Sequence, residues 1–198
     1  MPPEASGSKA HRVCPWWLGY FLASSLRKLW QDPREILAPF VREGQKVLEP
    51  GPGMGFFTME LARLVGPQGK VVAVDLQRKM IDSLKRRAAK AGLADRIEAR
   101  TTSPESLAID DLNGNIDFTL AFAMVHEMPD AARFFREAAA ASKVGGTLLL
   151  AEPRGHVKEA MFENELKLAG EAGFQVMDRP AIRHSHAAFL KFSGARSV

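Results

Sequence analysis

Residues 47–55 read Val47-Leu48-Glu49-Pro50-Gly51-Pro52-Gly53-Met54-Gly55, and this stretch decides the fold of the 198-residue chain. Two apolar residues and an acidic one precede three glycines at alternate positions, and an apolar run that suits a helix starts at Phe56. The order is that of a strand, a tight loop and the beginning of a helix. Glycines let such a loop turn sharply and approach a ligand, and free N–H groups at the helix start can meet an anion. The stretch therefore predicts a nucleotide-type binding loop.

Short β-rich runs alternate with longer helical runs around this loop. We expect strands at 47–48, 71–74, 97–100, 116–123 and 147–151, helices at 56–65, 80–91 and 131–142, and then a helix near 158–172 and strands at 174–178 and 187–192. Gly66-Pro67 and Gly92 end the first two helices, and Gly145-Gly146 is expected to close the third. This rhythm predicts one doubly wound α/β domain with a mostly parallel sheet.

An acidic residue follows the second strand. Asp75 comes about twenty residues after Gly55, directly after Val71-Val72-Ala73-Val74. A carboxylate in that place can accept hydrogen bonds from both hydroxyls of a ribose, although it could also merely cap the next helix. The glycine spacing is G-x-G-x-G with an acidic residue two positions ahead, whereas a dinucleotide site expects G-x-G-x-x-G. Pyrophosphate binding is therefore the second choice.

With these motifs the chain resembles class I S-adenosylmethionine-dependent methyltransferases from about residue 47 to residue 192. Residues 116–118, 125–130 and 143–150 look like the corresponding motifs of the small-molecule branch, which includes quinone-biosynthesis-type enzymes. The resemblance implies a Rossmann-like, seven-stranded sheet, mostly parallel with an antiparallel final strand, and S-adenosylmethionine as cofactor. It implies that Glu49 lies near the methionyl portion. The residues expected to bind the cofactor are Glu49, Gly51, Pro52, Gly53, Gly55, Asp75, Leu76, Ser103 and Phe122.

Ser103 is a departure from the family pattern. Many relatives offer an Asp to the adenine amino group from the loop after the third strand, and Ser103 is the residue that aligns with it. A serine hydroxyl can replace one hydrogen bond but not the charge.

His126 is the first candidate for a catalytic residue, because it follows the fourth strand at the sheet edge where ligands of such folds bind. A general base is needed only if the acceptor loses a proton as it attacks. A structural role for this histidine is the alternative. Behind it as candidates stand His11, Tyr20, Glu127 and Glu152, the last of which could instead cap a helix or pair with Arg154.

No metal site is predicted. His184 and His186 share one face of a strand, and His156 could join them, but no Cys or acidic cluster accompanies them in the sequence. Cys14 is the only cysteine, so an internal disulfide is excluded. Methyl transfer needs no covalent intermediate, which argues against Cys14 as a nucleophile.

The N-terminal part is expected to form two segments ahead of the main domain at 46–198. Residues 1–10 are predicted to be a disordered tail and residues 11–45 a helical cap. Trp16, Trp17, Tyr20 and Phe21 either cover the acceptor pocket as a lid or belong to the core.

Composition leaves the partner open. The net charge is +4 and the pI is near 9.4, which permits contact with nucleic acid without indicating it. The sequence lacks a secretory signal and any apolar run near the ~20 residues of a membrane helix, so a cytoplasmic location is expected. The protein is expected to be a monomer or a homodimer. The predicted function is methyl transfer by in-line displacement to a small-molecule acceptor. The alternatives are an RNA or protein acceptor and, behind them, a nicotinamide-dependent dehydrogenase.

Overall fold

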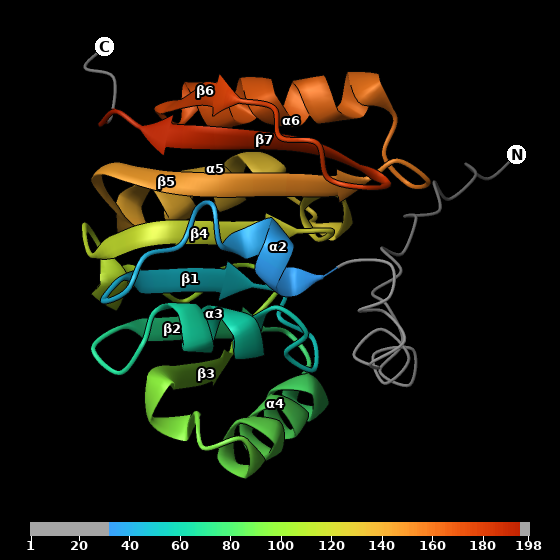
Figure 1. Cartoon of the computed structure of the whole chain (residues 1–198). Coiled ribbons are helices and arrows are strands. Elements are labelled where there is room, and N and C mark those ends of the chain that lie inside the picture. The colour runs from blue at the N-terminus through green and yellow to red at the C-terminus, as the bar shows by residue number, and fades with distance from the viewer. Residues whose placement is uncertain (1–31, 195–198) are drawn as a thin grey trace, which may run out of the picture.

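A seven-stranded sheet forms the centre of the molecule, in the order β3-β2-β1-β4-β5-β7-β6 (Figure 1). The computed structural model describes residues 32–194. The strands are β1 (Lys46–Pro50), β2 (Lys70–Asp75), β3 (Ile97–Thr101), β4 (Ile116–Phe122), β5 (Ser142–Pro153), β6 (Phe174–Asp178) and β7 (Ser185–Phe192). Strands β1 to β5 are parallel, and β7 is antiparallel to both of its neighbours. The predicted fold class is confirmed.

Helices cover both faces of the sheet. On one face α2 (Pro33–Leu37), α3 (Thr58–Leu64) and α4 (Arg78–Lys90) enclose one apolar cluster, and on the other α5 (Ala131–Ala141) and α6 (Glu159–Glu171) enclose a second (Figure 1). Residues 32–194 also contain three single-turn helices, η2 (Ala94–Arg96), η3 (Asp110–Leu112) and η4 (Val125–Glu127). Strands buried on both faces read as continuous apolar runs, as β2 and the second half of β5 do.

The helix boundaries follow from local chemistry. Asp130 begins α5 by accepting a hydrogen bond from the Arg133 N–H at 2.8 Å, and the turn after α4 places Gly92 at a φ of +66°. Asp32 likewise caps α2, so the Asp32-Pro33 pair begins a helix here. One boundary prediction is wrong: α5 ends at Ala141, and Gly145-Gly146 lies inside β5. There a Cβ on Gly146 would come within 2.9 Å of the Ile116 carbonyl oxygen, so the close approach of two strands requires this glycine.

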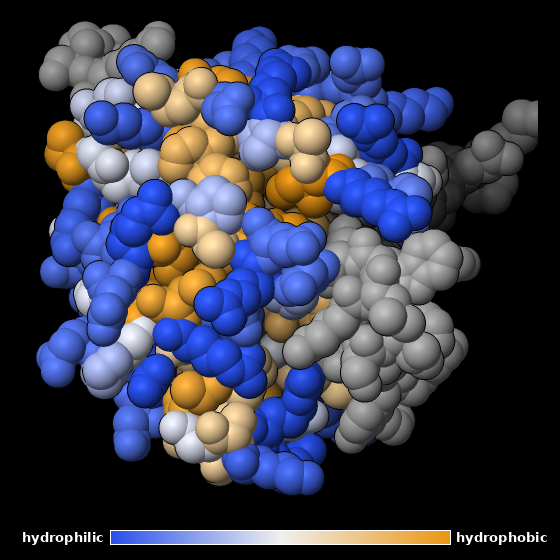
Figure 2. All heavy atoms as spheres, in the orientation of Figure 1, coloured by the Kyte–Doolittle hydropathy of each residue, from blue (hydrophilic) through white to orange (hydrophobic). Residues whose placement is uncertain are grey.

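The expected N-terminal segments fall mostly outside the description. Residues 1–31 are not among the described residues, and of the cap predicted at 11–45 only α2 and the chain after it are. Phe40, just after α2, packs on Phe189 of β7 with ring centroids 4.7 Å apart. Hydrophobic residues appear in patches between hydrophilic ones on the face that carries α2 (Figure 2). No helix among residues 32–194 is long and apolar enough to cross a membrane.

Candidate functional site

A cavity of about 470 Å³ opens at the carboxyl ends of the parallel strands. Its lining comes from the loops after β1, β2, β3, β4 and β5, which is where open α/β sheets bind ligands. Eight of the nine residues expected to bind the cofactor line it: Glu49, Gly51, Pro52, Gly53, Asp75, Leu76, Ser103 and Phe122. His126 lines it as well. The fold thus brings together residues from five separate loops.

The glycine-rich loop forms one wall of the cavity. Gly51, Gly53 and Gly55 all have positive φ angles, of +68°, +55° and +85°. Gly55 is the expected cofactor residue that does not line the cavity, and a Cβ there would lie 2.4 Å from Cδ1 of Leu84 on α4. Its role in this structure is therefore close packing of the loop on α4. The guanidinium of Arg87, also on α4, donates to the carbonyl oxygen of Met54 at 2.5 Å. This hydrogen bond fixes the loop through a residue that does not line the cavity.

Glu49 lies at the bottom of this wall with a carboxyl group that is almost fully buried. The residue is 3% exposed, and its Oε2 atom has no hydrogen-bond partner in the structure. Burial raises the pKa of Glu49 to about 8; the hydroxyl of Thr58 opposes this effect, and the nearby negative charge of Asp75 adds to it. A buried carboxyl without a partner is costly, so the cavity is complementary to a cationic or hydrogen-bond-donating ligand group at this point.

Asp75 ends β2 and holds the next turn. Its Oδ1 accepts from the Gln77 N–H at 2.8 Å and its Oδ2 from the Gly53 N–H at 3.2 Å. Asp75 therefore fixes the turn before α4, but it is not the cap of that helix that the sequence allowed, because the N-cap residue is Gln77. Each carboxylate oxygen keeps further acceptor capacity toward the cavity that the residue lines. Burial raises the pKa of this carboxyl, and the two N–H donors oppose that effect. Leu76 next to it is 39% exposed and presents an apolar surface to the cavity.

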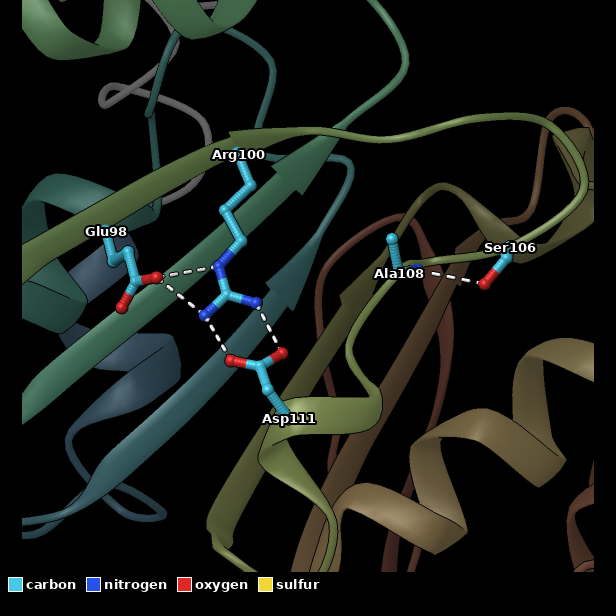
Figure 3. Close-up of polar contacts among 5 residues, drawn as sticks. All are labelled: Glu98, Arg100, Ser106, Ala108 and Asp111. Atoms are coloured by element: carbon cyan, nitrogen blue, oxygen red, sulfur yellow. Dashed lines mark hydrogen bonds and ion pairs between the residues drawn. The ribbon is translucent and has the colours of Figure 1, made fainter.

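The loop after β3 closes the cavity beside Ser103. Arg100 of β3 donates two hydrogen bonds, of 2.7 and 2.8 Å, to Asp111 of η3, and it also donates to Glu98 (Figure 3). These contacts tie together the two ends of the loop that joins β3 to η3. The Ala108 N–H donates to Ser106 Oγ at 3.0 Å within that loop. Helix α5 holds the same loop by other contacts, since Leu107 N–H donates to the Glu137 carboxylate at 2.7 Å. Ser103 itself is exposed and lines the cavity.

His126 lies in η4, just after the end of β4, and its ring reaches the end of β5. The chain leaves β4 through Ala123, whose φ of +56° is a strained angle for a residue with a side chain, and then enters η4. This turn brings Nδ1 of the His126 ring to within 2.5 Å of Oε2 of Glu152, at the end of β5. Glu152 thus pairs with His126, whereas Arg154 donates to the carbonyl oxygen of Ser185. The side chain of His126 is 13% exposed, and that of Glu152 is fully buried.

The other histidines do not gather. His186 stacks on Phe162 with ring centroids 5.5 Å apart, while His156 lies 6.0 Å from His126. Within residues 32–194, no group of three His, Cys, Asp or Glu side chains could hold a metal ion. His11, Cys14, Trp16, Trp17, Tyr20 and Phe21 lie outside the described residues.

The sequence reasoning missed the structural roles of two charged residues that lie outside the cavity lining, Arg87 and Glu165. The amphipathic pattern of the sequence assigns Arg87 to the solvent-exposed face of a helix. Only its partly buried contact with the glycine-rich loop reveals a different role. Glu165 of α6 is 6% exposed, and its Oε2 atom has no hydrogen-bond partner. The signal for Glu165 was weak: it is an acidic residue at a position that the helical period assigns to the buried face.

Comparison with known proteins gives a consistent picture. The family described as a methyltransferase domain matches residues 42–184. The ubiquinone/menaquinone biosynthesis C-methyltransferase UbiE of Cronobacter sakazakii is 30% identical over 158 residues, which cover 80% of this chain and 60% of that protein. The UbiE protein of Hahella chejuensis is 33% identical over 131 residues, 66% of this chain and 51% of that protein. The chain thus spans between half and 60% of the length of these relatives.

A solved structure has the same fold over nearly the whole chain. The S-adenosylmethionine-dependent methyltransferase from Aquifex aeolicus superposes with a TM-score of 0.81 at 22% identity. The match covers 91% of this chain and all of the Aquifex chain. At this identity the likeness shows the architecture, and the chemistry has to be argued from the site.

Proposed function

The chain belongs to the methyltransferase-domain family, whose Rossmann-like members use S-adenosylmethionine, and on that premise we propose that it transfers a methyl group from this cofactor to a small-molecule acceptor by in-line displacement. The observation that carries the proposal is the unpartnered, buried Oε2 of Glu49 beside the glycine-rich loop. A carboxylate there attracts a cationic methionyl group. The pyrophosphate of a nicotinamide dinucleotide is an anion and offers no positive charge to this carboxyl group, which argues against the dehydrogenase alternative.

The remaining lining residues fit the same cofactor. Asp75 would accept hydrogen bonds from the ribose hydroxyls, Leu76 and Phe122 would contact the adenine ring, and Ser103 would offer it one hydrogen bond. Bound S-adenosylmethionine supplies a methyl group that its sulfonium has already made electrophilic. The protein's own contribution is then to hold the acceptor in line, to exclude water and, where required, to remove a proton.

The acceptor end favours a small, largely apolar molecule. Phe56, Phe57, Met124 and Met128 line the cavity together with His126. Such a concave, mostly apolar site suits a small molecule better than a nucleic acid strand, which would need a broad basic face. The UbiE relatives are named for quinone biosynthesis, which is compatible with this class of acceptor.

Calorimetry with S-adenosylhomocysteine and with NAD tests the proposal. We expect the first to bind and the second to give no signal. Asp75→Ala should weaken S-adenosylhomocysteine binding by roughly 1–3 kcal/mol, because the ribose hydroxyls lose a charged acceptor. Asp82→Ala removes an exposed carboxylate on α4 that lies away from the cavity and serves as the control. Tight NAD binding without a response to S-adenosylhomocysteine would overturn the proposal.

A further inference from the structure

Each carboxylate oxygen of Glu152 contacts a different residue of η4. Its Oε1 accepts from the Val125 N–H at 2.8 Å, and its Oε2 lies 2.5 Å from Nδ1 of His126. Glu152 is fully buried and does not line the cavity, whereas His126 does. The carboxylate therefore acts on the cavity only through the histidine.

This contact fixes the proton on one side of the imidazole ring. An ionised carboxylate is only an acceptor, so Nδ1 has to carry the hydrogen, and Nε2 of the neutral ring then keeps its lone pair. The nearest charged atom to Nε2 is Oε1 of Glu127, at 4.0 Å, which is too far for a hydrogen bond. A ring with this tautomer can accept a proton from a molecule in the cavity.

The charges around His126 come from three elements and one loop. Glu152 faces it from β5, Glu127 from η4 and Glu165 from α6, while His156 lies beyond β5 with its ring centroid 6.0 Å away. The hydrogen bond to Glu152 is the main cause that raises the pKa of His126 above 6.5, and burial opposes it. Burial raises the pKa of Glu165 to about 8, so Glu165 is mostly protonated at neutral pH. The atom in hydrogen-bond contact with Nδ1 of His126 belongs to Glu152 and not to Glu165, so Glu152 is the group that holds the tautomer.

We propose that Glu152 is a positioning residue that holds His126 as the general base for methyl transfer, so that the acceptor is a hydroxyl or another nucleophile that still carries its proton. The inference rests on the proposed function and deepens it. The acceptor's O–H bond breaks, its proton passes to Nε2 of His126, and its electron pair becomes the new bond to the methyl carbon. The electron pair of the former carbon–sulfur bond stays on sulfur, and His126 ends as an imidazolium beside the Glu152 carboxylate.

Glu152→Gln separates positioning from mere packing. The Val125 N–H fixes the orientation of the new amide, because only the amide oxygen can accept from it. The amide NH₂ then points at Nδ1 of His126 and donates to it, which forces the ring proton onto Nε2. The histidine stays in place but has the wrong tautomer for a base facing the cavity. Glu165→Gln is the matched control, since it alters a buried glutamate nearby that the tautomer does not depend on.

Long-range ¹H–¹⁵N spectra of the full chain with ¹⁵N-labelled histidine measure this directly, with His126→Gln used for assignment. We expect His126 in the parent and in Glu165→Gln to carry the neutral-state proton on Nδ1, and in Glu152→Gln to carry it on Nε2 and titrate at lower pH. An Nε2–H tautomer in the parent, or the same tautomer in Glu152→Gln, would overturn the inference.

Transfer assays test the acceptor class with a pair of probes that differ in one atom. We expect the parent to methylate 1-naphthol, with a rate that rises as pH passes the pKa of His126. Glu152→Gln should lower kcat by about 100-fold or more at unchanged affinity for S-adenosylhomocysteine. Turnover of naphthalene-1-thiol alone, or of neither probe, would refute the acceptor class. Absence of S-adenosylhomocysteine binding would instead refute the proposed function and leave the tautomer result standing.

Discussion

At the scale of single residues, Glu49 is the group whose protonation state we expect to change when a cationic ligand enters the cavity. Its buried Oε2 atom has no partner, and burial raises its pKa to about 8. The folded, unliganded protein therefore binds more protons here than the unfolded chain, for which the pKa is near 4.5. The stability that Glu49 contributes is fully present below pH 4.5 and is lost as pH rises through about 8. A cation bound beside it reverses the balance, because it favours the carboxylate.

Binding of S-adenosylmethionine at pH 7 should release up to about one proton from Glu49. Calorimetry in two buffers of different ionisation enthalpy measures this number. In Glu49→Gln the release should disappear, and the affinity should no longer rise with pH between about 6 and 8, because the amide cannot ionise. Equal proton release in parent and variant would assign the proton to another group.

At the scale of elements, helix α4 sets the shape of the cofactor loop. Leu84 approaches Gly55 so closely that a Cβ at that glycine would lie 2.4 Å from Cδ1, and Arg87 donates to the Met54 carbonyl oxygen. Leu84 is fully buried, so its side chain has little room to move away. Strand β2 leads directly into α4 through Asp75, so the same βα unit supplies a cavity carboxylate and the support for the glycine loop.

Gly55→Ala should destabilise the protein more than Gly44→Ala. Both glycines have similar positive φ angles, +85° and +81°, but a Cβ at Gly44 meets no atom within 4 Å. The left-handed backbone should lower the free energy of unfolding of each variant by about 1–2 kcal/mol. In Gly55→Ala alone, the overpacked contact with Leu84 should lower it by roughly 1–3 kcal/mol more. Urea unfolding measures the difference between the variants. Equal losses would show that Leu84 moves aside without cost.

At the scale of the whole molecule, the described residues place two layers of helices on the faces of the sheet and a cavity at its carboxyl edge. The two apolar clusters lie on opposite faces of the sheet, and the cavity lies at its edge, lined by loops from β1 through β5. Both clusters reach the cavity, because Met124 and Phe134 of one cluster and Phe56 of the other also line it.

Deletion of residues 1–21 tests the lid that the sequence predicts, although that segment lies outside the described residues. We expect the deletion to spare most of the affinity for S-adenosylhomocysteine, because the lining expected to bind the cofactor falls between Glu49 and Phe122. Transfer to an acceptor such as 1-naphthol should be abolished. A deletion of residues 1–10 alone should change neither measurement. Global unfolding of the longer deletion in circular dichroism would identify the tryptophans as core.

The sequence by itself determined the features that depend on neighbours along the chain. Alternating apolar periods predicted the order of strands and helices. The glycine spacing after Val47-Leu48 and the position of Asp75 at the end of β2 marked residues that line the cavity. These features are local, because a turn, a cap or a strand is specified by residues within a few positions. The misplaced Gly145-Gly146 boundary shows the limit, since close strand contact and a helix end both favour glycine.

Only the tertiary structure decided which distant side chains meet. His126 and Glu152 are 26 positions apart, and they pair because β4 and β5 are adjacent and parallel with Phe122 beside Ala151. Arg87 reaches Met54 across 33 positions for a similar reason, through the packing of α4 against the glycine loop. A periodic sequence pattern predicts which face of a helix or strand is buried. Strand order and register decide which side chains of other elements that face contacts. Burial then sets the pKa values of Glu49 and Glu165, which no local pattern contains.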